Sequence, residues 1–275
     1  MINASVTISL VPQAKGGPFI YWDELKGSIA QAAEMGFHGV EIFPPDAAAV
    51  QQADLPRLLD RHGLQLAAMG TGAGWLLHRL HLCHPDAARR EQARQFIAGI
   101  VDVAGSLGAP AIIGSMQGRC EPGVTREQAL GWLAEALTSL GERAAGHGMP
   151  LLYEPLNRYE TDLLNQLVQA RDFLQRLHLS NLRLLADLFH MNIEEVSIPD
   201  AITQVVSQLG HVHWADSNRR AAGFGHLDLG PIALALGQGG YHGFVSAEAL
   251  PYPDSRTAAG QTMRTFRGLF GAAAG

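Results

Sequence analysis

Short apolar runs and longer amphipathic stretches alternate along the chain. Most of the runs follow a glycine, as in MGFHGVEIF, HGLQLAAM and HGMPLLYEP. Glycine at such a point fits the left-handed backbone that ends a helix before the chain turns into a strand. Runs that are apolar at nearly every position are typical of parallel strands with both faces buried. The pattern predicts eight strands, within residues 4–12, 35–43, 62–69, 107–115, 147–155, 179–187, 209–216 and 239–248.

The stretches between the runs carry apolar residues at a spacing near 3.6, the period of an amphipathic helix. They predict helices over residues 22–35, 49–62, 84–106, 125–147, 164–178, 199–208, 230–239 and 255–270. Eight βα units in about 250 residues are typical of a (β/α)8 TIM barrel. We therefore predict an α/β fold with a single TIM-barrel domain over residues 1–275. A doubly wound open sheet is the alternative, but SLVPQAKGGP, after the first strand, is no glycine-rich phosphate loop.

Composition suits a globular enzyme, with 47% apolar and 17% charged residues. The net charge of −6 argues against broad attraction to nucleic acid or to an anionic membrane. The two cysteines, Cys83 and Cys120, are too few for a disulfide scaffold and lack zinc-ligand spacing. The start, MINASVTISLVPQ, does not resemble a signal peptide, and no apolar run approaches the ~20 residues that span a bilayer. We expect a cytoplasmic protein that binds neither nucleic acid nor membrane.

Ionisable residues end the last four predicted strands. The chemistry of a TIM barrel lies at the carboxyl ends of its strands, so these side chains should meet at one mouth. Three buried carboxylates and a histidine would be unstable together unless a cation lay among them. The alternative is that each carboxylate belongs to a structural ion pair. The metal interpretation predicts four ligands, Glu154, Asp187, His213 and Glu248.

Three oxygen donors and one nitrogen donor suit a hard or borderline divalent ion. We expect Mn²⁺ first, with Mg²⁺, Co²⁺ or Zn²⁺ as alternatives. His211 lies one strand period before His213, so we expect it to be a hydrogen-bonded histidine deeper in the core. Glu41 closes the second predicted strand and either contacts substrate or orients a nearby Arg or Lys. Trp75 in GTGAGW is a candidate apolar wall for the pocket.

Four segments of the second half resemble a known family. They are EPLNRYETDLLN (154–165), DLFHMNIEE (187–195), HVHWADSNRRAAGFGH (211–226) and SAE (246–248). They are similar to sugar isomerases and epimerases with xylose-isomerase-like TIM barrels, and most of all to the D-tagatose 3-epimerase group. The resemblance implies one divalent metal on the four ligands above and an acid/base pair made of Glu154 and Glu248. It also implies that His190 and Arg219 contact substrate oxygens, and that the protein is a dimer or tetramer.

This chemistry is coherent for a small sugar. A metal that chelates the C2 carbonyl and the C3 hydroxyl of a ketose lowers the energy of the enediolate formed when the C3 proton leaves. One glutamate would remove the proton and the other would return it on the opposite face, which inverts C3. The same site could instead serve an aldose–ketose isomerase, a hydroxypyruvate isomerase or an inosose-type dehydratase. A sugar-binding barrel without catalysis and an AP endonuclease are less favoured, the latter because the ends of strands two to four carry no histidine.

Overall fold

Eight parallel strands close into a barrel in the computed structural model, which describes residues 1–22 and 24–271. Each strand pairs with the next along the chain, and the eighth pairs with the first. The strands are β1 (Ile2–Ser9), β2 (Gly39–Phe43), β3 (Gln65–Gly70), β4 (Ala111–Ile113), β5 (Leu151–Tyr153), β6 (Leu182–Asp187), β7 (Leu209–His213) and β8 (Gly243–Ala247). The predicted TIM-barrel fold is confirmed.

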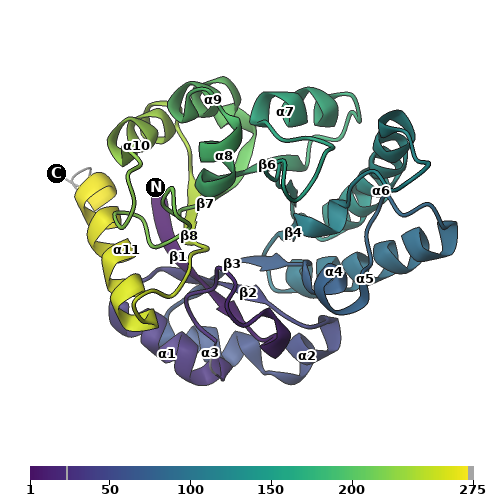
Figure 1. Cartoon of the computed structure of the whole chain (residues 1–275). Coiled ribbons are helices and arrows are strands. Elements are labelled where there is room, and N and C mark those ends of the chain that lie inside the picture. The colour runs from purple at the N-terminus through teal and green to yellow at the C-terminus, as the bar shows by residue number, and fades with distance from the viewer. Residues whose placement is uncertain (23, 272–275) are drawn as a thin grey trace.

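Helices surround the barrel, and the last of them lies beside the first (Figure 1). They are α1 (Leu25–Met35), α2 (Ala47–Gln52), α3 (Leu55–His62), α4 (Ala73–His78), α5 (Ala87–Ser106), α6 (Arg126–Gly146), α7 (Leu167–Gln175), α8 (Leu188–Glu194), α9 (Ile198–Val205), α10 (Leu229–Gln238) and α11 (Ser255–Phe270). Short 3-10 turns are η1 (Pro12–Ala14), η2 (Ser115–Gln117) and η3 (Val206–Gln208). Within the described residues, no helix has the length and apolar character needed to cross a membrane.

The predicted helix over 49–62 was wrong, because the chain forms two helices there. α2 ends at Gln52 and α3 begins at Leu55, with Asp54 between them at a φ of 47°. Pro56 explains the break: proline has no N–H to donate, and its ring would collide with the carbonyl four residues earlier. Two further helices, α4 and α8, form in loops for which we predicted none. α8 directly follows β6 and α4 begins three residues after the end of β3, so both lie at the carboxyl end of the barrel.

The interior of the barrel has an apolar half and a polar half. The apolar half is a small cluster of its own, made by Ala68, Ile112, Leu152 and Leu185 on four successive strands. The polar half is formed by strands that place buried ionisable side chains inside, as β2 does with Glu41 and β7 does with His211 and His213. The larger apolar core lies between strands and helices. The polar half of the interior is therefore where chemistry can occur.

Strand register brings the predicted ligands to one level. Asp187 pairs with His213 across β6 and β7, and His213 pairs with Ser246 on β8. Asp187 is also the N-cap of α8, since its Oδ1 accepts a hydrogen bond of 3.0 Å from the backbone N–H of His190. The strand therefore passes straight into a helix, and His190 is held close above the end of β6.

Candidate active site

A cavity of about 290 Å³ lies at the carboxyl ends of the strands. Seven of the eight site residues predicted from the sequence line it, and Asp187 lies buried next to it. Its apolar wall includes Phe19, Phe43, Trp75 and Leu76. A pocket of mostly apolar walls with a few convergent polar groups is typical of small-molecule sites. The ionisable groups here are Glu41, Glu154, Glu160, His190, His213, Arg219 and Glu248.

The four predicted metal ligands converge on one another. His213 Nδ1 lies 3.1 Å from Glu154 Oε1, 3.2 Å from Asp187 Oδ2 and 3.5 Å from Glu248 Oε2. One ligand atom from each of the four residues lies within 4.8 Å of all the others. Glu154 and Glu248 directly follow β5 and β8, while Asp187 and His213 are the last residues of β6 and β7. Four neighbouring strands thus supply one side chain each.

Glu41 fixes which nitrogen of His213 faces this cluster. Glu41 Oε1 lies 3.2 Å from His213 Nε2, and its Oε2 lies 2.8 Å from Nε2 of His211. A carboxylate only accepts hydrogen bonds, so Nε2 of His213 carries the hydrogen. The Nδ1 lone pair of a neutral His213 then faces three carboxylates, an arrangement that requires a cation. A divalent ion fits this donor set, and a carboxylate behind the ligating histidine is the usual support for one.

Electrostatics separates the carboxylates into two kinds. Burial raises the pKa of Glu154, and the negative charges of Glu248 and Asp187 raise it further, against the opposing effect of His213. Burial likewise raises the pKa of Glu248. Burial alone would raise the pKa of Asp187 too, but His190 and His213 lower it below its usual range. Asp187 is thus held ionised, whereas the two glutamates are the groups that take up a proton more readily.

The same charges act on the two histidines of β7. Burial lowers the pKa of His213, but the surrounding carboxylates, above all Glu248, raise it well above its usual value. Burial lowers the pKa of His211, which stays below its usual value despite Glu41. His211 is therefore the neutral, hydrogen-bonded core histidine that the sequence predicts. His213 is the one at which a cation, whether proton or metal, is stabilised.

His190 offers one ring nitrogen to the cavity. Its Nδ1 lies 2.7 Å from Asn157 Nδ2 and accepts a longer bond, 3.3 Å, from the Asn157 backbone N–H. With Nδ1 acting as the acceptor, the hydrogen of the neutral ring is on Nε2. This Nε2 is buried and lies 4.0 Å from Asp187 Oδ2, too far for a hydrogen bond, and it has no hydrogen-bond partner among the described residues. An unsatisfied donor at the wall of a cavity is suited to bind an oxygen of a ligand.

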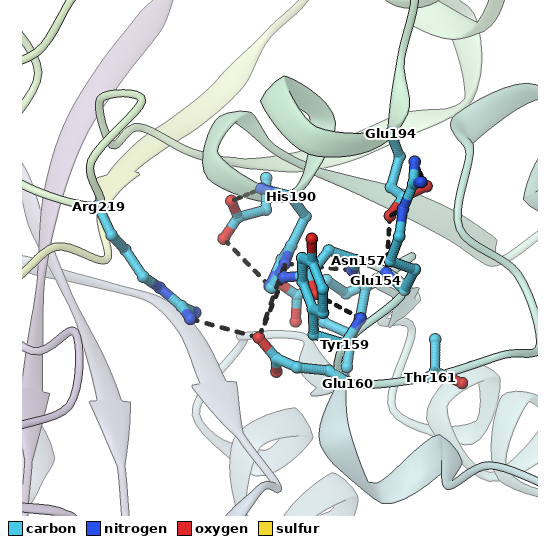
Figure 2. Close-up of polar contacts among 12 residues, drawn as sticks. Glu154, Asn157, Tyr159, Glu160, Thr161, His190, Glu194 and Arg219 are labelled. Atoms are coloured by element: carbon cyan, nitrogen blue, oxygen red, sulfur yellow. Dashed lines mark hydrogen bonds and ion pairs between the residues drawn. The ribbon is translucent and has the colours of Figure 1, made fainter.

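Arg219 reaches the acid cluster from the loop after β7. It donates from Nη2 to Glu248 Oε2 at 3.1 Å and from Nη1 to Glu160 Oε1 at 3.5 Å. Its guanidinium lies over the ring of Phe189, with Cζ 4.7 Å from the centroid. Figure 2 shows Arg219 and His190 both pointing toward Glu160. The guanidinium therefore neutralises part of the charge of Glu248 and closes one side of the cavity.

The structure corrects two placements made from the sequence. Glu41 does not close its strand but lies in the middle of β2, with its carboxylate inside the barrel. It contacts two histidines rather than an Arg or Lys. The seventh predicted strand, 209–216, ends at Asp216, so this carboxylate was expected at the mouth with His213. Its carboxylate instead accepts backbone N–H groups of Ser217, Gly223 and Leu227, and so shapes the loop that carries Arg219.

Sequence reasoning missed three residues of the site. Asn157 fixes the ring of His190, and Glu160 pairs with Arg219; both lie in the EPLNRYE segment, where the polar residues beside Glu154 were a usable signal. The third is Gly114, directly after β4. A Cβ there would collide with the carboxylate of Glu154. No sequence pattern indicates this contact, because it joins two different strands.

Comparison with known proteins agrees with the fold. The family described as "Xylose isomerase-like TIM barrel" matches residues 29–269. The chain belongs to this family. A D-psicose 3-epimerase from Ruminiclostridium cellulolyticum is 27% identical over 91% of this chain and 88% of its own length. A 3-dehydro-D-guloside 4-epimerase from Escherichia coli is 29% identical over 78% of this chain and 83% of its own length.

A solved structure supports the same fold. The D-allulose 3-epimerase from Methylomonas sp., in complex with D-allulose, superposes with a TM-score of 0.82 at 22% identity, covering 98% of this chain and 97% of that one. The resemblance to sugar epimerases drawn from the sequence is confirmed, since the curated relatives carry these activities. The chain is an enzyme of the isomerase and epimerase class.

Proposed function

We propose that the protein is a divalent-metal-dependent ketose 3-epimerase. The observation that carries the proposal is the pair Glu154 and Glu248, which come from strands separated by β6 and β7. Their carboxylates lie 3.1 and 3.5 Å from the same atom, Nδ1 of His213, in the wall of one cavity. Epimerisation requires a base on one side of a carbon and an acid on the other, and two separate carboxylates can supply both.

The ligand set proposed for the metal is Glu154, Asp187, His213 and Glu248. This donor set favours Mn²⁺, with Mg²⁺, Co²⁺ or Zn²⁺ as alternatives. The chemistry that such an ion supplies is stabilisation of negative charge on the substrate oxygens beside the reacting carbon. The protein supplies the proton transfer: one glutamate takes the proton from C3, and the other delivers a proton to the opposite face.

Other residues of the cavity would hold the sugar. The Nε2–H of His190 donates to a substrate oxygen, because no protein acceptor among the described residues occupies it. Arg219 holds Glu248 in place and can donate a further hydrogen bond to a hydroxyl. Trp75 lies on the apolar wall, where a carbon face of the sugar can pack. Glu41 acts through His213 and, as a residue lining the cavity, remains a candidate for direct contact.

Deuterium labelling tests the two-base mechanism. Protein loaded with Mn²⁺ and incubated with D-fructose or D-psicose in D₂O should give a C3-inverted product that carries deuterium at C3. Glu154→Gln and Glu248→Gln should each lower turnover by about 10²–10⁴-fold, the range for loss of a general acid or base. Glu195→Gln, a half-buried glutamate that accepts a bond from the Leu167 backbone outside the cavity, is the matched control.

The single variants also give a sharper signature. With one base removed, exchange at C3 should persist for one epimer and vanish for the other, because each glutamate serves one face. Full activity in either variant, with bound metal measured in both, would refute the two-base mechanism. Label only at C1 would make the protein an aldose–ketose isomerase. The cytoplasmic location and the dimeric or tetrameric state stay predictions, the latter open to light scattering.

Epimerisation at C4 beside a C3 ketone is the second candidate. It is favoured by the 29% identity to the 3-dehydro-D-guloside 4-epimerase. The proton lost is again the one next to a carbonyl, so the same two glutamates would serve. Incubating the protein with a 3-keto-glucoside in D₂O tests this reaction, because deuterium should then enter C4, whereas the ketose 3-epimerase reaction places it at C3 of D-fructose or D-psicose.

A further inference from the structure

A second cavity lies beside the active-site pocket. It has a volume of about 200 Å³, against about 290 Å³ for the pocket itself. Trp75, Ser115 and Glu160 line both cavities, so the two meet at these side chains. The proposed proton-transfer chemistry uses nothing in the second cavity. Two adjoining spaces of similar size suit a ligand built of two similar units better than a single small sugar.

Aromatic side chains form part of this second cavity. Trp75 is held in place by an edge-to-face contact with His81, with ring centroids 5.6 Å apart, and by Arg79, whose guanidinium lies 5.1 Å from the indole. Tyr159 also lines the cavity, yet 75% of its surface is exposed. Its backbone is nevertheless anchored, since its N–H donates to Asn157 Oδ1 at 2.9 Å. A fixed backbone with a bare aromatic ring offers the carbon face of a sugar ring a packing surface.

A buried polar atom in the wall adds a hydrogen-bonding group. His81 is only 2% exposed, and its Nδ1 has no partner among the described residues, while its Nε2 lies 3.4 Å from Glu121. Gly118 stands next to this nitrogen with a φ of 85°, and a Cβ there would collide with the ring. A side chain at this point would press on the ring, so glycine leaves room beside the buried nitrogen for a hydrogen-bonding partner, which a ligand hydroxyl would supply.

The charges around the two cavities select against a phosphate. Among the described residues, the second cavity has one arginine or lysine, the exposed Arg119, and the acidic Glu160 lines the same cavity. In the first cavity, Arg219 is already paired with Glu248 and Glu160. A phosphate dianion would meet several carboxylates and no free pair of cations. The second unit is therefore an uncharged, hydroxyl-rich one.

We infer that this second cavity, lined by Trp75, His81, Gly118, Arg119 and Tyr159, is a subsite for a neutral sugar ring joined to the reacting keto sugar by a glycosidic bond. The inference rests on the proposed function and names its substrate class: the protein acts on glycosylated keto sugars in preference to free monosaccharides. The enzymes that supply such a substrate would be those that cleave larger glycans or oxidise a hydroxyl of a glycoside.

The test compares D-fructose with maltulose and isomaltulose, two glucosyl-fructose disaccharides in which the C2 carbonyl and the C3 hydroxyl are free. At least one disaccharide should show a kcat/KM above that of D-fructose. The Tyr159→Ala variant should lower the ratio of disaccharide to monosaccharide kcat/KM by about twofold to tenfold, the effect of one aromatic contact. Tyr252→Ala, a matched exposed tyrosine that lines neither cavity, should leave the ratio unchanged.

Saturation-transfer NMR keeps this inference separate from the catalytic proposal. Transfer from the protein to the glucosyl ring, weakened in Tyr159→Ala, supports the subsite even if no substrate turns over. A failure of turnover together with such transfer would count against the proposed reaction alone. A D-fructose kcat/KM equal to or above that of both disaccharides, or no transfer to the glucosyl ring, overturns the subsite. A preference for fructose 6-phosphate would likewise overturn the neutral character assigned to the second unit.

Discussion

Replacing Glu41 by glutamine should weaken divalent-metal binding while the barrel stays folded. The Glu41 carboxylate accepts from Nε2 of His211 at 2.8 Å and from Nε2 of His213 at 3.2 Å. Glutamine has the same size but only one acceptor oxygen, so it can satisfy only one of the two N–H groups. Glu41 is 4% exposed, and bulk water cannot replace the missing acceptor. In the variant, Nε2 of His213 therefore loses either its hydrogen-bond acceptor or the negative charge of that acceptor.

The size of the effect follows from these contacts. A hydrogen bond to a charged acceptor contributes about 1.5–3 kcal/mol. If most of this acts on the orientation and basicity of His213, the dissociation constant for the metal should rise by about 10–100-fold. Removing the charge also lessens the attraction that the site has for any cation. The loss of the hydrogen bond and the loss of the charge both weaken metal binding.

Isothermal titration of metal-stripped protein with MnCl₂ measures the change directly. Glu160→Gln is the control, because Glu160 lines the same cavity and contacts Arg219 but is not near His213. Its metal affinity should match that of the unaltered protein. Thermal melts of the metal-free variants would verify that both are folded. An unchanged affinity in a folded Glu41→Gln variant would refute the role given to Glu41.

Four further outcomes follow from the site. Gly114→Ala should lower kcat sharply with little loss of fold, because the added Cβ displaces the Glu154 carboxylate; a wild-type kcat would contradict this contact. Asp216→Ala should speed amide exchange over 217–227 and raise KM through Arg219. Burial raises the pKa of Asp216, but the backbone N–H groups that it accepts from lower it overall. The contribution of Asp216 to the stability of the fold is therefore complete above a pH of about 4 and is lost in more acidic solution. Thermal melts at a series of pH values would show this. Chelation should abolish C3 exchange and lower the melting temperature, since ligand at a hundred times its dissociation constant stabilises by about 2.7 kcal/mol.

Several features of the fold could be predicted because they depend on local sequence. Strand and helix periods differ, and glycine favours the left-handed helix end before a strand, as Gly36 shows at the end of α1. The break between α2 and α3 could also have been predicted from Pro56. The spacing of apolar residues alone takes no account of proline. Helix α8 was missed because its seven residues follow a strand without a turn.

The sequence by itself determined the alternating βα order and the residues that end strands five to eight. Parallel strands in a barrel all point the same way, so strand-end residues meet at one mouth whatever the details of packing. Only the tertiary structure decided which atoms face one another. Glu41 and His213 are 172 positions apart, and shifts in register near Glu41 and Leu185 set their depth in the barrel. Barrel closure, a non-local property, therefore makes Glu41 the support of His213.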